Sequence, residues 1–282
     1  MPLNYRHSPL VLLNPLQVLL WTFRRAEQDV VNLYNSLSPV MQLATGGEML
    51  NFGYWKDARE PLAAQRALCW LVGDIAELRS AKSVIDVGSG LAAPARLWKS
   101  AYDANICCTN INYDQLRASK PKALSLTNAT STYLPYADKC ADRIIALESA
   151  QHFRPLTRFV RESRRILKAG GLLVTAMPVV TASFATLKLG ILTATWSSEH
   201  YGLDYVKAII EDGGFSIDSI KLIGKQVYDP LADYYIKNRP AIRQRILQQY
   251  PPLLETVLYR SILKMKQVSE KNVIDYAIVK AA

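Results

Sequence analysis

The sequence is poor in the residues that build metal and disulfide sites. Its 282 residues include only four cysteines and three histidines. No two cysteines have C-x-x-C spacing and the histidines complete no zinc-type set, so neither a metal site nor a disulfide framework is expected. Cys107 and Cys108 adjoin in a β-like run, where they are expected to pack as small apolar side chains. These features predict reduced cysteines, as in a cytoplasmic protein.

Long apolar runs are also missing. The apolar stretch at 10–21 is interrupted by Asn14 and Pro15, and it is shorter than the roughly 20 apolar residues that span a bilayer. Arg24 and Arg25 follow this stretch, whereas a signal peptide carries its basic residues before the apolar part. We expect an N-terminal helix packed on the domain, with a helix lying on a membrane surface as the alternative.

Acidic residues are outnumbered. There are 24 of them against 34 lysines and arginines, which gives a net charge of +10. Such a charge is compatible with nucleic acid or an anionic membrane as partner. The basic residues are spread along the chain without the interleaved aromatics of a nucleic-acid surface, so we expect no nucleic acid. Residues 221–282 hold eleven basic and five acidic residues, a local excess that suits an anionic acceptor or peripheral membrane contact.

Short β-branched runs alternate with helical patterns from residue 83 onwards. The predicted strands are 83–87, 105–111, 123–126, 143–147, 172–177, 216–223 and 273–279. The predicted helices of this part are 93–102, 113–119, 156–168 and 203–212. Alternation of this kind predicts an α/β fold with a mostly parallel sheet covered on both faces.

Two further regions flank or interrupt this core. Residues 29–78 have a helical pattern with a break at Ser38-Pro39 and a second helix at 61–78. A tyrosine-rich, basic and helical insertion at about 229–267 precedes the last strand. Such an insertion is typical of a substrate lid, although its tyrosines equally suit attachment to the core. We therefore divide the chain into a helical cover, 1–79, and a core, 80–282.

A strand that runs into glycines and then into a helix is the sharpest motif. It reads Val84-Ile85-Asp86-Val87-Gly88-Ser89-Gly90. Glycines allow a tight turn and the close approach of a ligand, and a helix N-terminus favours negative charge. Gly88, Gly90 and Ala93 also fit the dinucleotide-binding pattern. Asn110 stands where a nicotinamide enzyme places an acid on the ribose, which argues against that cofactor.

Further segments follow or precede this motif in a recognisable order. They are Phe52-Gly53-Tyr54-Trp55, Asn110-Ile111-Asn112-Tyr113-Asp114-Gln115, Thr127-Asn128-Ala129, Leu147-Glu148-Ser149-Ala150-Gln151-His152-Phe153 and Arg165-Ile166-Leu167-Lys168-Ala169-Gly170-Gly171. Together with Asp86–Gly90 they resemble class I S-adenosylmethionine-dependent methyltransferases of the small-molecule branch, which act on natural products, quinones or sterols. The resemblance implies a Rossmann-like, doubly wound, seven-stranded sheet with an antiparallel last strand.

The resemblance also implies a cofactor, S-adenosyl-L-methionine, and the residues that bind it. By position these are Asp86, Gly88 and Gly90 near the methionine portion, Asn110 and Gln115 near the ribose, Asn128 and Ala129 near the adenine, and Tyr34 and Trp55 closing over the cofactor. The sequence departs from the family where Asn110 and Asn128 replace acids and Ala169 replaces a proline. Loss of two carboxylates weakens or shifts the contacts to the nucleoside, while the backbone site is kept.

Two residues are candidates for the chemistry. His152 and Glu148 follow the fourth predicted strand, at the sheet edge where open α/β folds place ligands. Histidine titrates near neutrality and suits a general base, which is needed when the acceptor is protonated. His152 equally suits capping a helix or orienting a loop, and Glu148 equally suits holding loop amides.

These observations predict methyl transfer to an O, N or C atom of a small, hydrophobic molecule. The alternatives are a lipid-modifying enzyme similar to the cyclopropane synthases, for which no characteristic cysteine can be located, an RNA methyltransferase, and a noncatalytic nucleoside-binding module. The expected partner is a small-molecule acceptor. A homodimer and a monomer both stay open.

Overall fold

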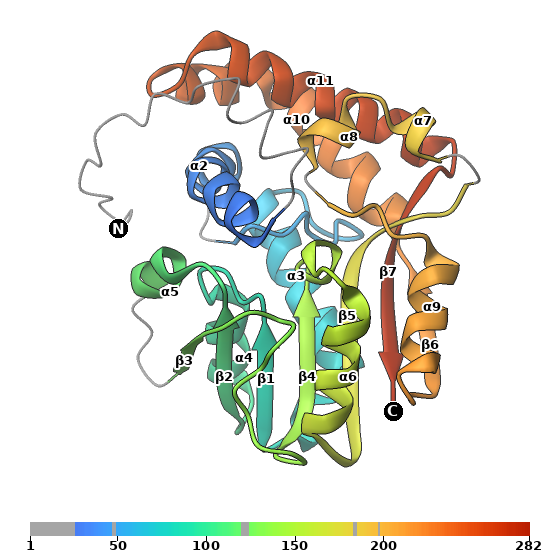
Figure 1. The fold of residues 1–282 in the computed structure, drawn as a ribbon. Coiled ribbons are helices and arrows are strands. Elements are labelled where there is room, and N and C mark those ends of the chain that lie inside the picture. Colours follow the sequence, from blue (N-terminus) through green and yellow to red (C-terminus); the bar gives the residue numbers. More distant parts are fainter. Residues whose placement is uncertain (1–25, 47–48, 120–123, 183–184, 197) are drawn as a thin grey trace.

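The computed structural model describes residues 26–46, 49–119, 124–182, 185–196 and 198–282 (Figure 1). The apolar stretch at 10–21, predicted to form an N-terminal helix, lies outside the described residues. Within the described ranges, no helix combines the length and the apolar character needed to cross a membrane.

A seven-stranded sheet forms the centre of the protein. Its strand order is β3-β2-β1-β4-β5-β7-β6. The strands are β1 (Ser83–Val87), β2 (Asn105–Asn110), β3 (Ser125–Asn128), β4 (Ala141–Leu147), β5 (Leu167–Val180), β6 (Ile217–Leu222) and β7 (Ile274–Ala281). Strands β1 to β5 are parallel, and β7 runs antiparallel to both β5 and β6. The predicted α/β, mostly parallel, Rossmann-like fold is confirmed.

Helices cover both faces of the sheet and the end at which its parallel strands terminate (Figure 1). They are α2 (Glu27–Thr45), α3 (Pro61–Ile75), α4 (Ala93–Ala101), α5 (Tyr113–Ser119), α6 (Leu156–Ile166), α7 (Ala185–Leu189), α8 (Leu192–Thr195), α9 (Leu203–Asp212), α10 (Gly224–Leu247) and α11 (Pro252–Glu270), with short 3-10 turns η1 (Leu78–Ser80) and η2 (Ala150–His152). Successive strand residues point to opposite faces, so Val84 packs with Trp98 of α4 while Ile85 packs with Phe159 of α6. Each face thus has its own core.

Several predicted boundaries are wrong by a few residues. β5 was expected at 172–177 but extends from Leu167 to Val180, because it pairs with β7 over 173–180 and with β4 at Leu167. That pairing ends α6 at Ile166, two residues before the predicted end at 168. β3 starts at Ser125, two residues later than predicted, where its register with β2 begins.

The predicted helix break at Ser38-Pro39 is also wrong. α2 continues through Pro39 to Thr45. A proline inside a helix removes one backbone donor, and here the tertiary contacts on both sides hold the helix together. Ser38 Oγ donates to the carbonyl of Tyr34 at 2.6 Å, and Val40 is buried against Tyr235 and Ile242.

The helical insertion consists of α10 and α11, so it spans 224–270 and is wider than the predicted 229–267. The two helices cross above the end of the sheet at which β4 terminates, on the same side as α2 (Figure 1). Glu255 of α11, with no exposed surface, accepts from Arg239 Nε at 2.9 Å and Nη2 at 3.1 Å. Tyr228 and Tyr235 are buried, which fits attachment of the insertion to the core.

Candidate functional site

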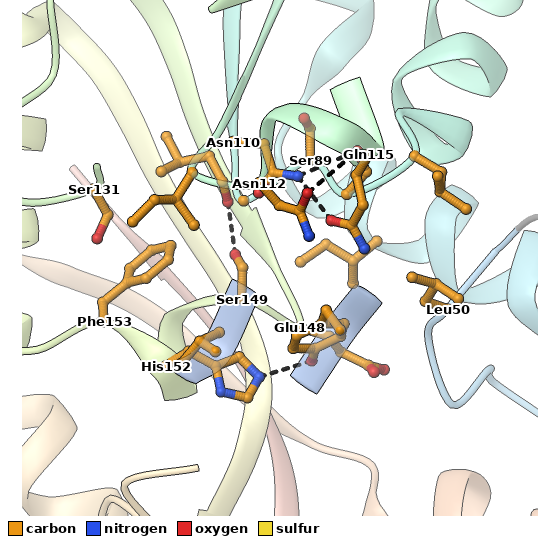
Figure 2. Close-up of a pocket in the computed structure, with 18 of the residues that line it drawn as sticks. Leu50, Ser89, Asn110, Asn112, Gln115, Ser131, Glu148, Ser149, His152 and Phe153 are labelled. Atoms are coloured by element: carbon orange, nitrogen blue, oxygen red, sulfur yellow. Dashed lines mark hydrogen bonds between the residues drawn. The ribbon is translucent and has the colours of Figure 1, made fainter. Parts of the chain in front are cut away.

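A cavity lies at the carboxyl ends of β1, β2 and β4, beneath α2. It encloses about 1080 Å³, including the part that opens to solvent. Figure 2 shows Glu148 and His152 along one side of the hollow and Ser89, Asn110, Asn112 and Gln115 along the other. Parallel sheets place ligands at this edge, and the volume suits a nucleoside-sized molecule.

The loop after β1 bends through two glycines in the left-handed region. Gly88 has φ 77° and Gly90 has φ 54°. A Cβ at Gly88 would lie 2.3 Å from Cβ of Ser149, so only glycine fits there, whereas no atom of the described residues lies within 4 Å of a Cβ at Gly90. The Gly88 amide was expected to face a ligand, but it donates to the Thr109 carbonyl at 2.7 Å. Gly88 therefore shapes the turn, and Gly90 keeps the cavity open.

Asp86 lies beneath this loop and does not line the cavity. It is 2 % exposed, and its Oδ2 has no hydrogen-bond partner among the described residues. Burial raises the pKa of Asp86 to about 7. The structure therefore separates this carboxyl from direct contact with a ligand in the cavity.

The end of β2 carries a pair of amides. Asn110 and Gln115 both line the cavity, and Asn110 Nδ2 donates to Gln115 Oε1 at 2.9 Å. Gln115 Nε2 donates in turn to Ser38 Oγ of α2 at 3.0 Å. Asn112 Nδ2 donates to Asn35 Oδ1 of α2 at 2.7 Å. These bonds fasten α2 over the cavity as its roof.

The two residues predicted near the adenine are placed differently from each other. Ala129 lines the cavity, together with Thr130 and Ser131. Asn128 does not, because its Nδ2 donates to the carbonyls of Asn110 and Ile111, each at 2.9 Å. Asn128 thus holds the backbone that follows β2.

The two aromatic residues predicted to close over the cofactor also differ. Tyr34 lines the cavity, and its hydroxyl lies 2.8 Å from Nε2 of His152. Trp55 is 4 % exposed and lies outside the lining. Its Nε1 donates to the Phe52 carbonyl at 2.9 Å, and its ring packs against Tyr234 of α10 at 5.5 Å. Trp55 therefore joins the insertion to the segment before α3.

Glu148 and His152 line the cavity on the side of β4. Glu148 adopts φ 51°, a costly conformation for a residue with a side chain, at the point where β4 ends. Its Oε1 accepts from the Phe52 amide at 2.9 Å and from the Tyr276 hydroxyl at 3.1 Å. Burial raises the pKa of Glu148 to about 8, although both hydrogen bonds lower it.

Asn51 is a cavity residue that the sequence did not single out. It is 7 % exposed and lies one residue before the aromatic segment 52–55. Its Oδ1 is buried without a partner among the described residues, while its Nδ2 lies 3.6 Å from Sγ of Cys69. A buried acceptor of this kind suits a cationic donor from a ligand. Its place beside the aromatic segment was the one available signal.

Comparison with known proteins agrees with this geometry. Residues 85–175 match the family model described as a methyltransferase domain. The chain is 25 % identical over 242 residues to the erythromycin 3''-O-methyltransferase of Saccharopolyspora erythraea, covering 77 % of this chain and 78 % of that one. The chain is a class I S-adenosylmethionine-dependent methyltransferase. Its cofactor is S-adenosyl-L-methionine, as the sequence predicted.

Solved structures show how widely the fold of this methyltransferase occurs. The [4+2]-cyclase SpnF superposes with a TM-score of 0.75 at 20 % identity, covering 91 % of this chain and 96 % of that one. The mycolic acid cyclopropane synthase CmaA1, complexed with SAH and CTAB, has a TM-score of 0.74 at 15 % identity, covering 88 % and 95 %. At these identities the shared property is the fold.

Proposed function

We propose that this methyltransferase methylates a hydroxyl oxygen of a small, largely apolar natural product. The observation that carries the proposal is a single cavity that holds the open Gly90 turn, the Asn110–Gln115 pair and, across from them, the imidazole of His152. The erythromycin 3''-O-methyltransferase of Saccharopolyspora erythraea, by its name an O-methyltransferase of a macrolide, supports the acceptor class.

The residues present suit S-adenosylmethionine, which supplies an electrophilic methyl group on a sulfonium. Gly90 leaves room for close approach to the backbone, and Asn51 Oδ1 offers an acceptor for the ammonium group. Asn110 and Gln115 would offer amides to the ribose hydroxyls, and Ala129 would border the adenine, since all three line the cavity. Asp86 lies beneath the glycine turn and Asn128 holds the backbone after β2, whereas Trp55 joins the insertion to the segment before α3.

His152 is the proton acceptor of this proposal. A hydroxyl oxygen attacks carbon more readily as its proton leaves, and a positioned base typically contributes about 10²–10⁴-fold. Holding acceptor and methyl group in line contributes further, because orientation alone can supply about 7–11 kcal/mol. Glu148, tied to Phe52 and Tyr276, fixes the wall beside His152.

The lipid-modifying alternative receives less support. Cyclopropane synthases share the fold, but the sequence showed no characteristic cysteine near an acceptor, and the residues that line the described cavity include none. The insertion contributes none of the lining residues either. Its role as a lid, cytoplasmic location, peripheral membrane contact through its basic residues and a homodimer all stay predictions.

The test is turnover with a macrolide probe. The full chain is incubated with S-adenosylmethionine and erythromycin lacking its 3''-O-methyl group, followed by other hydroxylated macrolactones. We expect S-adenosylhomocysteine and O-methylated product in equal amounts, with kcat lowered about 10²–10⁴-fold in His152→Ala and cofactor affinity unchanged. Conversion of a probe without consumption of the cofactor, or methylation at carbon or nitrogen alone, contradicts the proposal.

A pair of glycine variants tests the cofactor site. Gly90→Ala meets no atom of the described residues, and its left-handed φ of 54° costs an alanine only about 1–2 kcal/mol, so we expect a chain that still folds. It should bind S-adenosylhomocysteine at least about 10-fold more weakly, as calorimetry can measure. Gly88→Ala meets Ser149 at 2.3 Å, so we expect loss of more than about 2 kcal/mol of unfolding free energy. Equal S-adenosylhomocysteine affinity and equal unfolding free energy of the two variants would show that neither glycine of the turn faces the ligand.

A further inference from the structure

We propose that Tyr34 is a catalytic residue, which takes the proton from the acceptor hydroxyl and passes its own proton to His152. The inference deepens the proposed function and rests on it, because it assumes a protonated acceptor. It assigns the first contact of the acceptor to the phenol of α2 and makes the imidazole the second member of a relay.

Tyr34 and His152 are 118 residues apart in the sequence, but their side chains are in contact. The Tyr34 hydroxyl lies 2.8 Å from His152 Nε2, the length of a good hydrogen bond. Their rings are 5.3 Å apart and nearly perpendicular, at 87°. Both residues line the cavity, so the pair faces the space in which the reaction is proposed to occur.

If His152 acts as the base, Tyr34 must be the donor in this hydrogen bond. Burial first, and then the carboxyl of Glu148, raise the pKa of Tyr34 well above its usual range, so the phenol keeps its proton at any working pH. If Nε2 of His152 is to accept a proton, it must be the acceptor and Tyr34 the donor. The phenol oxygen then keeps its lone pairs for a donor in the cavity.

An acceptor hydroxyl therefore meets Tyr34 before His152, because the phenol already occupies Nε2. In the step, the acceptor oxygen bonds to the methyl carbon and the carbon–sulfur bond breaks, with its electron pair left on sulfur. The acceptor proton moves to Oη of Tyr34 while the Tyr34 proton moves to Nε2. The imidazolium that results loses a proton to solvent.

Several charged or titratable groups surround this pair. Glu148 lies on the same wall, and burial raises its pKa to about 8, so near pH 7 it places little negative charge beside the imidazolium. Arg154 also lines the cavity and lies 4.0 Å from Glu199, so its charge is partly offset. Glu27 of α2 borders the same cavity and contacts Thr130. The relay therefore lies between a largely uncharged Glu148 and an arginine whose charge is partly offset.

The relay also depends on how α2 docks. Asn35 bonds to Asn112 and Ser38 bonds to Gln115, one residue and four residues after Tyr34. These bonds fix the turn of helix that presents the phenol. The same contacts join α2 to the Asn110–Gln115 pair, so the roof and the relay are held by one network.

The experiment compares Tyr34→Phe, which keeps the ring and removes the hydroxyl, with Tyr133→Phe, an exposed tyrosine outside the cavity, as matched control. With the macrolide probe, we expect Tyr34→Phe to lower kcat about 30-fold or more, with the S-adenosylhomocysteine Kd within about 2-fold of the parent. The rise of kcat with pH that the relay predicts for the parent should disappear in Tyr34→Phe. The double variant Tyr34→Phe/His152→Gln should have a kcat no lower than that of the slower single variant. A weakened Kd with unchanged kcat would make Tyr34 only a cover for the cofactor.

A second measurement needs no acceptor. Nitrogen-15 NMR of the His152 ring in the complex with S-adenosylhomocysteine should show an unprotonated Nε2 and a protonated Nδ1, and Tyr34→Phe should change the Nε2 shift. A ring protonated at Nε2 overturns the relay even if the chain methylates hydroxyls. Absence of O-methylated product from the parent chain, by contrast, contradicts the proposed function itself.

Discussion

The Glu148 side chain joins three segments of the chain at this site. It takes a left-handed backbone conformation at the end of β4, and its Oε1 accepts from the Phe52 amide and the Tyr276 hydroxyl. These bonds link β4, the segment before α3 and β7 at one carboxyl. Burial nevertheless dominates and raises its pKa to about 8 from an ordinary value of 4.5. The carboxyl is therefore mostly protonated in the folded protein near pH 7.

This raised pKa gives the stability a predictable dependence on pH. Between about pH 4.5 and 8 the unfolded chain loses the Glu148 proton while the folded protein keeps it, so the unfolding free energy falls as pH rises. Glu148→Gln cannot titrate and keeps both acceptor contacts. We expect its stability relative to the parent to increase by about 1–3 kcal/mol from pH 5 to pH 8 in urea denaturation.

The control for this measurement is Glu211→Gln, an exposed glutamate at the end of α9. Its stability should follow the pH profile of the parent. The titration of Asp86 is common to all three chains and cancels in the differences. Parallel profiles for the parent and Glu148→Gln would show that the carboxyl is ionised in the folded state.

At the scale of elements, one buried carboxylate joins the two helices of the insertion, beside an apolar cluster that they share. Glu255 of α11 holds Arg239 through two bonds and lies 3.5 Å from Arg243, both on α10. The Arg239 guanidinium also lies 3.5 Å from the centre of the Tyr259 ring. A buried charge of this kind needs its partners in place, so it favours the arrangement of α10 and α11 in which both arginines reach it.

Removal of that carboxylate should loosen the insertion more than the sheet. For Glu255→Ala we expect a loss of about 1–3 kcal/mol of stability, because α10 and α11 lose the charge-assisted hydrogen bonds from Arg239, whereas the two arginines are themselves partly exposed to water. Hydrogen exchange should become faster in 224–270 and stay unchanged in β1 and β4. Glu270→Gln, at an exposed pair with Lys266, should change stability by less than about 1 kcal/mol. Uniformly faster exchange would show that the insertion and the sheet unfold as one unit.

At the scale of the whole molecule, a ligand in the cavity contacts both the core and the N-terminal roof. β1, β2 and β4 supply its floor, and α2 closes it through bonds to Asn112 and Gln115. Such a ligand binds the folded protein only, and it therefore shifts the folding equilibrium by mass action.

Thermal unfolding measures this coupling. S-adenosylhomocysteine at 100 times its Kd should add about 2.7 kcal/mol of stability and raise Tm by about 5–10 °C. NAD, which the glycine pattern alone also suggested, should give no comparable shift, since Asn110 supplies no carboxylate for its ribose. A larger shift with NAD would contradict the identification of the cofactor.

The periodicity of apolar residues along the sequence predicted much of the fold. The alternation after residue 83 predicted the parallel sheet, and the glycine turn predicted which strand end carries the site. Of the predicted site residues, Tyr34, Gly88, Gly90, Asn110, Gln115, Ala129, Glu148 and His152 border one cavity. Asp86, Asn128 and Trp55 do not, because a motif gives the place of a residue along a strand but not the partner to which its side chain turns.

The sequence by itself determined the α/β class and the ligand-binding end of the sheet, because these depend on short-range patterns of apolar residues and glycines. The kind of cofactor was implied by the resemblance of its ordered motifs to a known family. Only the tertiary structure decided that α2 runs through Pro39, that the insertion lines none of the described cavity and that Tyr34 meets His152. These features are contacts between segments distant in sequence. Packing and hydrogen bonding across the whole chain fix them, and no local pattern records that outcome.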